Sequence, residues 1–287
     1  MQLHVNDGRS DLNRLILQLW RRRFLLALLA TVGGAAGIAL SFWVSPEYKA
    51  DAVLIASDEI LGLNASGALG SLGGLASLVG VGGAGNKESE AVETLKSRGL
   101  TISYIESNGL MPILFPGRWD VATNKGKADF RGHVLTLEDG YRKFDKSVRA
   151  VVENRKTGLV NITVTWTDPN LAKQWVDGLI KAANDRLRTK AEERSSRNLE
   201  YLRKASEATT IMEVKTSIYK LMETEIKKQM VAYGADDYAF RTVDAAIVPQ
   251  RRSYPIRALF LFFGALLVPL VYVAGVWLRD AKAKLIN

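Results

Sequence analysis

Three glycines, Gly80, Gly82 and Gly85, have the spacing of a loop that binds nucleotide phosphates. In dinucleotide-binding proteins this Gly-x-Gly-x-x-Gly pattern follows a strand and opens a helix, so that backbone N–H groups approach the pyrophosphate. Here the pattern lies in the glycine-dense segment Leu61–Gly85, where such spacing arises by chance, and the acidic residue that would hold a ribose is not evident. We therefore expect no nucleotide cofactor.

Histidine, cysteine and carboxylate chemistry has few candidates in this chain. The sequence contains two histidines, His4 and His133, and no cysteine, whereas a zinc site needs three or four protein ligands. The acids Glu138 and Asp139 would suit glycoside hydrolysis only as part of an opposed pair, and adjacent acids are more typical of a solvated turn. Since we find no convincing set of catalytic, cofactor-binding or metal-binding residues, we expect that the protein is not an enzyme.

Two apolar runs of membrane length lie near the two ends of the chain. Phe24–Val44 and Ala258–Leu278 contain no charged residue. At about 1.5 Å per residue, each spans roughly the 30 Å of bilayer hydrocarbon. Arg21–Arg23 precede the first run as they would in a cleavable signal peptide, but the run is longer than the apolar region of such peptides. We predict transmembrane helices over residues 24–44 and 258–278.

Basic residues beside these runs predict how the protein lies in the membrane. Short flanks rich in Lys and Arg stay in the cytoplasm, whereas long segments are translocated largely regardless of their charge. Residues 1–23 and 279–287 are therefore predicted to be cytoplasmic, and residues 45–257 to be periplasmic. The flanks also account for part of the formal net charge of +9. They contain Arg9, Arg14, Arg21, Arg22, Arg23, Arg279, Lys282 and Lys284.

The exported segment has the sequence pattern of an α+β domain. Residues 160–166 alternate apolar and polar side chains, as in a sheet with one buried face. Further strands are expected over residues 48–56, 148–153 and 242–248, and an amphipathic helix is expected over residues 86–107. We predict a mixed β-sheet that is packed by helices and flanked in sequence by the two transmembrane helices.

A long helical hairpin is predicted to protrude from this domain. Asp168 and Pro169 form a helix start, because the carboxylate caps free N–H groups and proline suits the first helical position. Apart from Gly178, neither glycine nor proline interrupts the helix until about residue 208, which gives a length of roughly 60 Å. A return helix over about 213–233 would complete an antiparallel pair.

Several segments between the two terminal spans form a recognisable series. They are the glycine-rich segment with Glu90–Arg98, Asp168-Pro169-x-x-Ala172-x-x-Trp175, residues 212–232, Asp237–Pro249, and Pro249, Pro255, Gly264 and Pro269. In this order they resemble the Wzz-type chain length determinants, also called polysaccharide co-polymerases. The basic residue that this family usually places right after its second proline is displaced here to Arg257. Within the second span, Gly264 would also permit close approach of another helix.

The resemblance implies a non-catalytic protein of the bacterial inner membrane that regulates the chain length of a lipid-linked surface polysaccharide, such as an O-antigen, a capsule or an exopolysaccharide. It implies a ring-shaped homo-oligomer, with a membrane polysaccharide polymerase, the lipid-linked polysaccharide and membrane lipids as partners. No nucleic-acid partner is expected. Some relatives carry a cytoplasmic kinase domain after the second span, and the residues Arg279–Asn287 are too few for one.

The residues leave a second function open. A two-span membrane sensor has the same outline of an exported domain between anchors, and it would signal through a separate cytoplasmic partner. The short cytoplasmic segments leave no room for a signalling domain of its own. An effect on polysaccharide length would distinguish chain length regulation from sensing.

Overall fold

The computed structural model describes residues 23–57, 84–120, 122–123, 125–128, 132–234 and 237–286. The chain forms two units. One comprises residues 48–251, here called the body unit, and the other, called the span unit, comprises residues 1–47 together with 252–287. Each unit is described by itself.

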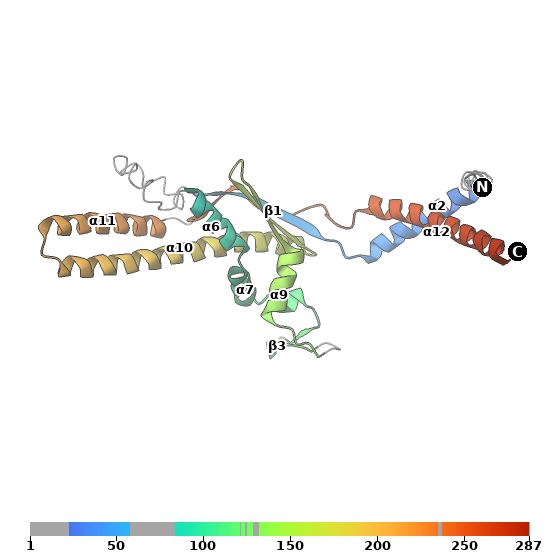
Figure 1. Ribbon diagram of the computed structural model, residues 1–287. Helices are drawn as coiled ribbons and strands as arrows, with labels where there is room; N and C mark the ends of the chain where they lie inside the picture. The colour runs from blue at the N-terminus through green and yellow to red at the C-terminus, as the bar shows by residue number, and fades with distance from the viewer. Residues whose placement is uncertain are drawn as a thin grey trace, which may run out of the picture. The chain divides into compact units, whose positions relative to one another are not determined.

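A four-stranded sheet forms the centre of the body unit (Figure 1). Its strand order is β4-β5-β1-β6, and every pair in this sheet is antiparallel. The α+β class is therefore confirmed, but the sheet is antiparallel where a mixed sheet was expected. Strand β6 also ends earlier than expected, because residues 245–250 are irregular. The strands are β1 (Tyr48–Ala56), β4 (Arg149–Asn154), β5 (Leu159–Trp166) and β6 (Phe240–Asp244).

One face of the sheet is buried beneath helices. The alternating residues of β5 behave as the sequence indicates, because Ile162 and Val164 are buried whereas Asn161 is exposed. Trp175 lies in this core, with its ring centroid 5.0 Å from that of Trp166. The helices that contact the strands are α6 (Ala84–Lys96), the π-helix η1 (Phe144–Val148) and the first half of α10. The helices α7 (Arg98–Ser107), α8 (Met111–Leu114) and α9 (Leu137–Lys143) pack into the same hydrophobic core.

The single helix expected over residues 86–107 is broken at Ser97. Ser97 has an extended backbone, and its hydroxyl accepts a hydrogen bond from the N–H of Leu100 at 3.2 Å. This is an N-cap, so a new helix starts there although the apolar spacing continues across the break. Between α8 and residue 132 the chain also forms a small antiparallel pair, β2 (Trp119–Asp120) and β3 (Lys125–Gly126).

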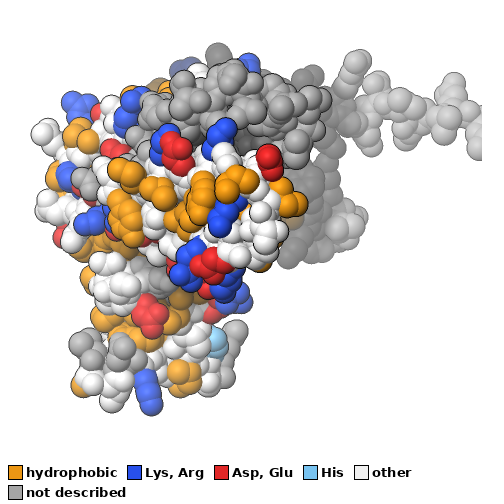
Figure 2. Space-filling view, turned by 90° about the vertical axis from the view of Figure 1, so that its left-hand side faces the viewer, with side chains coloured by type: hydrophobic (Ala, Val, Ile, Leu, Met, Phe, Trp, Pro, Cys, Tyr) orange, Lys and Arg blue, Asp and Glu red, His pale blue; other side chains and the backbone are white. Residues whose placement is uncertain are grey.

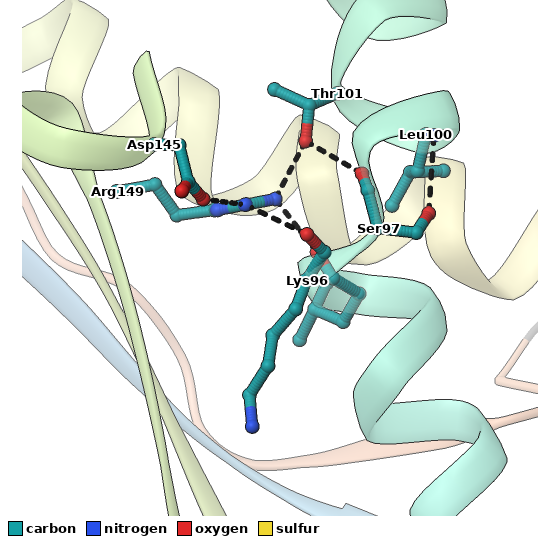
Figure 3. A network of polar contacts seen from close by, with 7 residues as sticks. Lys96, Ser97, Leu100, Thr101, Asp145 and Arg149 are labelled. Atoms are coloured by element: carbon teal, nitrogen blue, oxygen red, sulfur yellow. Dashed lines mark hydrogen bonds and ion pairs between the residues drawn. The ribbon is translucent and has the colours of Figure 1, made fainter. Parts of the chain in front are cut away.

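A buried arginine joins this helix break to the sheet (Figure 3). The Arg149 guanidinium donates to the carbonyl oxygens of Leu95 and Lys96 at 2.8 and 3.0 Å, and to the Thr101 hydroxyl at 2.7 Å. It also forms an ion pair with Asp145. Because the Arg149 side chain is only 2% exposed, these partners replace the water that its charge would otherwise bind.

The long hairpin consists of α10 (Pro169–Ala208) and α11 (Met212–Gly234), which lie side by side in Figure 1. Asp168 caps α10, because its Oδ1 accepts hydrogen bonds from the N–H groups of Asn170 and Leu171. The first half of α10 packs on the sheet, and the second half contacts α11. This is the protruding hairpin that the sequence predicted.

The span unit contains two packed helices, α2 (Arg23–Trp43) and α12 (Arg257–Ile286). They begin within one residue of the apolar runs found in the sequence. Helix α12 continues beyond Leu278 to Ile286, so the short basic segment after the second run is helical rather than a separate tail.

Candidate functional site: the paired spans and the helical hairpin

Two helices of the span unit are long and apolar enough to cross a membrane. They are Arg23–Trp43 and the first part of α12, Arg257–Gly275, as judged by length and composition. Most of their large side chains, such as Phe262 and Leu266, are exposed, as expected for a surface that meets lipid instead of water. These helices coincide with the apolar runs predicted to span the bilayer.

Glycines let α2 and α12 approach each other closely. A Cβ atom added to Gly33 would overlap the carbonyl oxygen of Gly264, and one added to Gly264 would overlap that of Gly33. A Cβ on Gly37 would overlap the carbonyl oxygen of Phe260. Small residues drive helix association in lipid because they bring backbones into contact. The expectation that Gly264 permits a close helix approach is confirmed, and its partner is the first span.

The two chain segments at one end of this helix pair are also joined. The Glu47 N–H donates to the Tyr254 carbonyl oxygen at 3.0 Å, and the Ser253 N–H donates to the Glu47 carbonyl oxygen at 2.7 Å. The Arg257 guanidinium carbon lies 4.5 Å from the centroid of the Phe42 ring, a cation–π contact. The segment leaving α2 and the segment entering α12 are therefore held together.

The seam of the hairpin is narrow and partly polar. Residues of α11 that face α10 recur three and four apart, and Ile218 is buried among them. The Ser195 hydroxyl lies 3.3 Å from Glu225 Oε2, and Gln229 Nε2 lies 3.3 Å from the Ser196 hydroxyl. The facing residues of α11 are Lys215, Ile218, Met222, Glu225, Gln229 and Ala232.

The environment of Glu225 favours its charged form. Burial by itself would raise the pKa of this carboxyl, but hydrogen bonds from Lys228, Asn198 and Ser195 and the charge of Lys228 lower the pKa below its ordinary value. Glu225 therefore holds the two helices together as a carboxylate rather than as a neutral acid.

A buried asparagine, Asn184, ties α10 to the edge strand β6. Its Nδ2 donates to the Phe240 carbonyl oxygen at 3.1 Å. Its Oδ1 accepts from the N–H groups of Ala239 and Phe240 at 3.0 and 2.8 Å. Sequence reasoning missed this residue, although a single amide between the buried Ile180 and Leu187 on an apolar helix face is a detectable signal.

The residues considered for catalysis have structural roles. His133 Nε2 lies 3.0 Å from Asp139 Oδ2, and the same oxygen accepts the N–H and hydroxyl of Thr136 in a capping box. Glu138 pairs with Arg98 and Arg142. Of the glycine triplet, Gly80 and Gly82 lie outside the described residues. Among the residues that are described, no group of three or more potential metal ligands occurs.

Residues 9–107 match the family model described as "Wzz: Chain length determinant protein". The matched range covers about a third of the chain. In the described residues, the matched range contains α2, β1, α6 and α7. The resemblance recognised in the sequence is thereby confirmed over these residues. Among curated proteins, nothing matches the chain.

Solved structures of Wzz-type proteins are similar to the chain at low identity. A full-length bacterial polysaccharide co-polymerase is 12% identical, with 95% of this chain and 98% of that chain covered and a TM-score of 0.39. A fragment of the polysaccharide co-polymerase WzzB from Salmonella Typhimurium is 10% identical, with 73% and 100% covered and a TM-score of 0.35. A mutant of WzzBSF, the Shigella flexneri lipopolysaccharide O-antigen chain-length regulator, is 10% identical, with 72% and 100% covered and a TM-score of 0.27.

These likenesses carry no residue role or contact over to this chain, because the identities are at most 12% and the TM-scores at most 0.39. Nothing in the comparisons supports the two-span sensor.

Proposed function

We propose that the protein is a non-catalytic co-polymerase that regulates the chain length of a lipid-linked surface polysaccharide. The observation that carries the proposal is the match of residues 9–107 to the chain length determinant model. Two candidate membrane helices, one before and one after an α+β unit in the chain, support it. The polysaccharide is an O-antigen, a capsule or an exopolysaccharide.

The protein is placed in the bacterial inner membrane with two passes. The basic flanks Arg21–Arg23 and Arg279–Lys284 support cytoplasmic termini, so the body unit lies in the periplasm. There it works as a ring-shaped homo-oligomer beside a membrane polysaccharide polymerase, and both contact the lipid-linked polysaccharide. Length control requires no bond-making group on this protein, because a scaffold can act through how long the growing chain stays with the polymerase.

The outer face of α12 is the proposed contact with the polymerase inside the bilayer. The face that contains Gly264 is already occupied by α2. Phe262 and Leu266 stand two residues on either side of Gly264, and at about 100° per residue they lie on the opposite face. Their side chains are exposed, so another membrane helix can reach them.

Deletion of the gene tests the function. We expect surface polysaccharide to be made still, with a changed distribution of chain lengths on a gel, and the full-length gene to restore the original distribution. A chain carrying Phe262→Ala and Leu266→Ala should restore it only in part. An unchanged length distribution in the deletion strain would refute the proposed function.

Labelling tests the topology independently. Because the natural chain has no cysteine, Thr163→Cys, Arg194→Cys and Lys284→Cys each introduce a single thiol. In cells with a permeable outer membrane, an impermeant thiol reagent should label the first two variants and leave the third unlabelled. Labelling of only Lys284→Cys would show that the body unit is cytoplasmic.

A further inference from the structure

Helix α11 carries a second apolar stripe beside the residues that face α10. This set, here called the α11 stripe, consists of Met212, Tyr219, Ile226, Met230 and Tyr233. These residues lie seven, seven, four and three positions apart along the helix and therefore share one face. Each side chain is between 45% and 70% exposed. The stripe is about 30 Å long and lies roughly a quarter turn around the helix from the hairpin seam.

The opposite side of the hairpin carries a smaller apolar patch, here called the Tyr201 patch. It consists of Tyr201, Val214 and Leu221, which are 72%, 44% and 55% exposed. In an antiparallel pair, the helical positions place this patch on one broad side and the α11 stripe on the other. Figure 2 looks at the end of the hairpin and shows hydrophobic side chains reaching the surface there.

The stripe and the patch stand at the same height along the hairpin. The contacts of Ser195 with Glu225 and of Ser196 with Gln229 set the register of the two helices. In this register, Tyr201 of α10 lies level with Leu221 and Tyr219 of α11. Tyr219 of the stripe and the residues Leu221 and Tyr201 of the patch are therefore level, on opposite sides of one protomer.

Charges on the two sides are complementary. By helical position, the side with the Tyr201 patch carries the cations Lys190, Arg194 and Lys228 and the acids Glu213 and Glu225. Lys190 and Lys228 also pair with Glu90 and Glu225 of the same chain. The side with the α11 stripe carries more acids than bases, and Glu192 lies at nearly the same height as Arg194. The charged residues on that side are Asp185, Glu192, Glu200, Arg203, Glu207, Lys215 and Glu223.

We propose that the α11 stripe of one copy packs on the Tyr201 patch of a second copy of this chain, with Tyr219 against Leu221 and Tyr201. This inference rests on the proposed function, in which copies anchored in one membrane point the same way. The stripe of one copy and the patch of the next copy then lie at the same height above the membrane, so they can meet without a shift of either copy along the membrane normal. Such a head-to-tail contact leaves one free stripe and one free patch at each step, so it can close into a ring.

Cysteine cross-linking between two differently marked full-length chains tests the contact. One chain carries Tyr219→Cys and the other carries Leu221→Cys, and neither has any other cysteine. After co-expression and mild oxidation in membranes, we expect a disulfide that joins the two kinds of chain. Either variant expressed alone should give at least fivefold less cross-linked product, since identical positions do not meet in a head-to-tail contact.

Two results would overturn the proposed contact between the stripe and the patch. Cross-linking of Tyr219→Cys with itself would show a symmetric contact between two stripes. Absence of cross-links in a wild-type-sized oligomer would show that the copies meet elsewhere. In either case, a length change in the deletion strain would leave the proposed function standing. Conversely, the expected cross-link together with an unchanged length distribution would support the surface and refute the function.

A matched pair of variants measures how much the stripe contributes. Tyr219→Glu places a negative charge in the stripe, whereas Lys220→Glu places one on the exposed face of α11 that points away from α10. Loss of a buried aromatic anchor should weaken association about tenfold or more, as followed by light scattering in detergent. Lys220→Glu should leave the oligomer unchanged. Equal effects of the two variants, or none from Tyr219→Glu, would contradict the proposal.

Discussion

The two halves of α10 lie in contrasting surroundings. Its first half is buried in the core of the body unit, where Trp175, Leu179 and Ala183 are at most 2% exposed. Its second half contacts mainly α11, across a partly polar seam that includes the contact of Ser195 with Glu225, and Lys190 also pairs with Glu90 of α6. The same helix is thus held by a dense core at one end and by a thin seam at the other.

The two regions differ in how fully the chain covers its own apolar side chains. In the core around the sheet, apolar side chains are covered by neighbouring elements, as in a well-packed interior. In the hairpin, α11 has more apolar side chains than α10 covers, and Met230 and Tyr233 remain two-thirds exposed. The hairpin thus differs from the core in presenting apolar side chains at its surface, as interaction sites do.

The largest expected effect comes from the core end of α10. Trp175→Ala removes a fully buried ring that contacts Phe144 and Trp166, and should lower the free energy of unfolding by about 4 kcal/mol. Met222→Ala in the seam should cost about 1 kcal/mol, because that side chain is only partly buried. Urea unfolding of the full-length chain in detergent measures both. Equal losses of unfolding free energy in the two variants would show that the core and the hairpin seam hold α10 equally strongly.

A second expected effect concerns the arginine that anchors the helices of the body unit. Arg149→Met leaves two carbonyl groups and the Asp145 carboxylate without their donor, and should cost about 3 kcal/mol. Arg149→Lys should not restore stability, because an ammonium cannot match the planar guanidinium fork. The control Arg142→Met removes an exposed ion pair with Glu138 and should change stability by less than about 1 kcal/mol.

A third variant tests the asparagine between α10 and β6. Asn184→Ala leaves the N–H groups of Ala239 and Phe240 without their acceptor, and should cost about 2 kcal/mol. Hydrogen exchange should rise first at these two amides. The control Asn161→Ala changes an exposed residue on the open face of the sheet and should be nearly neutral. Unchanged exchange at Ala239 would show that the amide is not what holds β6.

Alkaline pH should weaken the body unit through Tyr104. Burial, with a smaller contribution from Asp177, raises the pKa of the Tyr104 hydroxyl from its ordinary value of 10.0 to about 12. Because the folded pKa is raised, the stabilisation is complete below pH 10 and is lost as the pH rises from 10 to 12. At pH 11 the loss is about 1 kcal/mol. Tyr104→Phe should unfold with a weaker dependence on pH over this range.

Acid pH should weaken the hairpin through Glu225. Its pKa is lowered below the ordinary value of 4.5, so its stabilisation is present above pH 4.5 and is lost as the pH falls through the folded pKa. Its partial exposure makes this the smallest effect. Glu225→Gln should remove the acid dependence of hydrogen exchange in the second half of α10 and in α11, while exchange in the four-stranded sheet is unaffected. An unaltered acid profile would show that Glu225 does not link the helices.

The sequence predicted where the long helices and the two spans lie better than it predicted which residues of distant segments touch. Asp168 and Pro169 marked the start of α10, and the apolar runs marked both spans, because these signals are local. Gly264 was recognised as a site of close approach, but Gly33 was not identified as its partner. Asn184 was missed, since its bonds reach residues 55 and 56 positions further along the chain.

By itself, the sequence determined which segments are apolar enough for lipid, which alternate as strands and which form a long hairpin, because periodicity and length depend on neighbouring residues. Only the tertiary structure decided that the sheet is antiparallel, that Ser97 starts a new helix and that α2 fills the glycine face of α12. Those outcomes depend on which distant backbones meet, and the packing of the whole unit selects them over the local preference. The same packing leaves the α11 stripe uncovered.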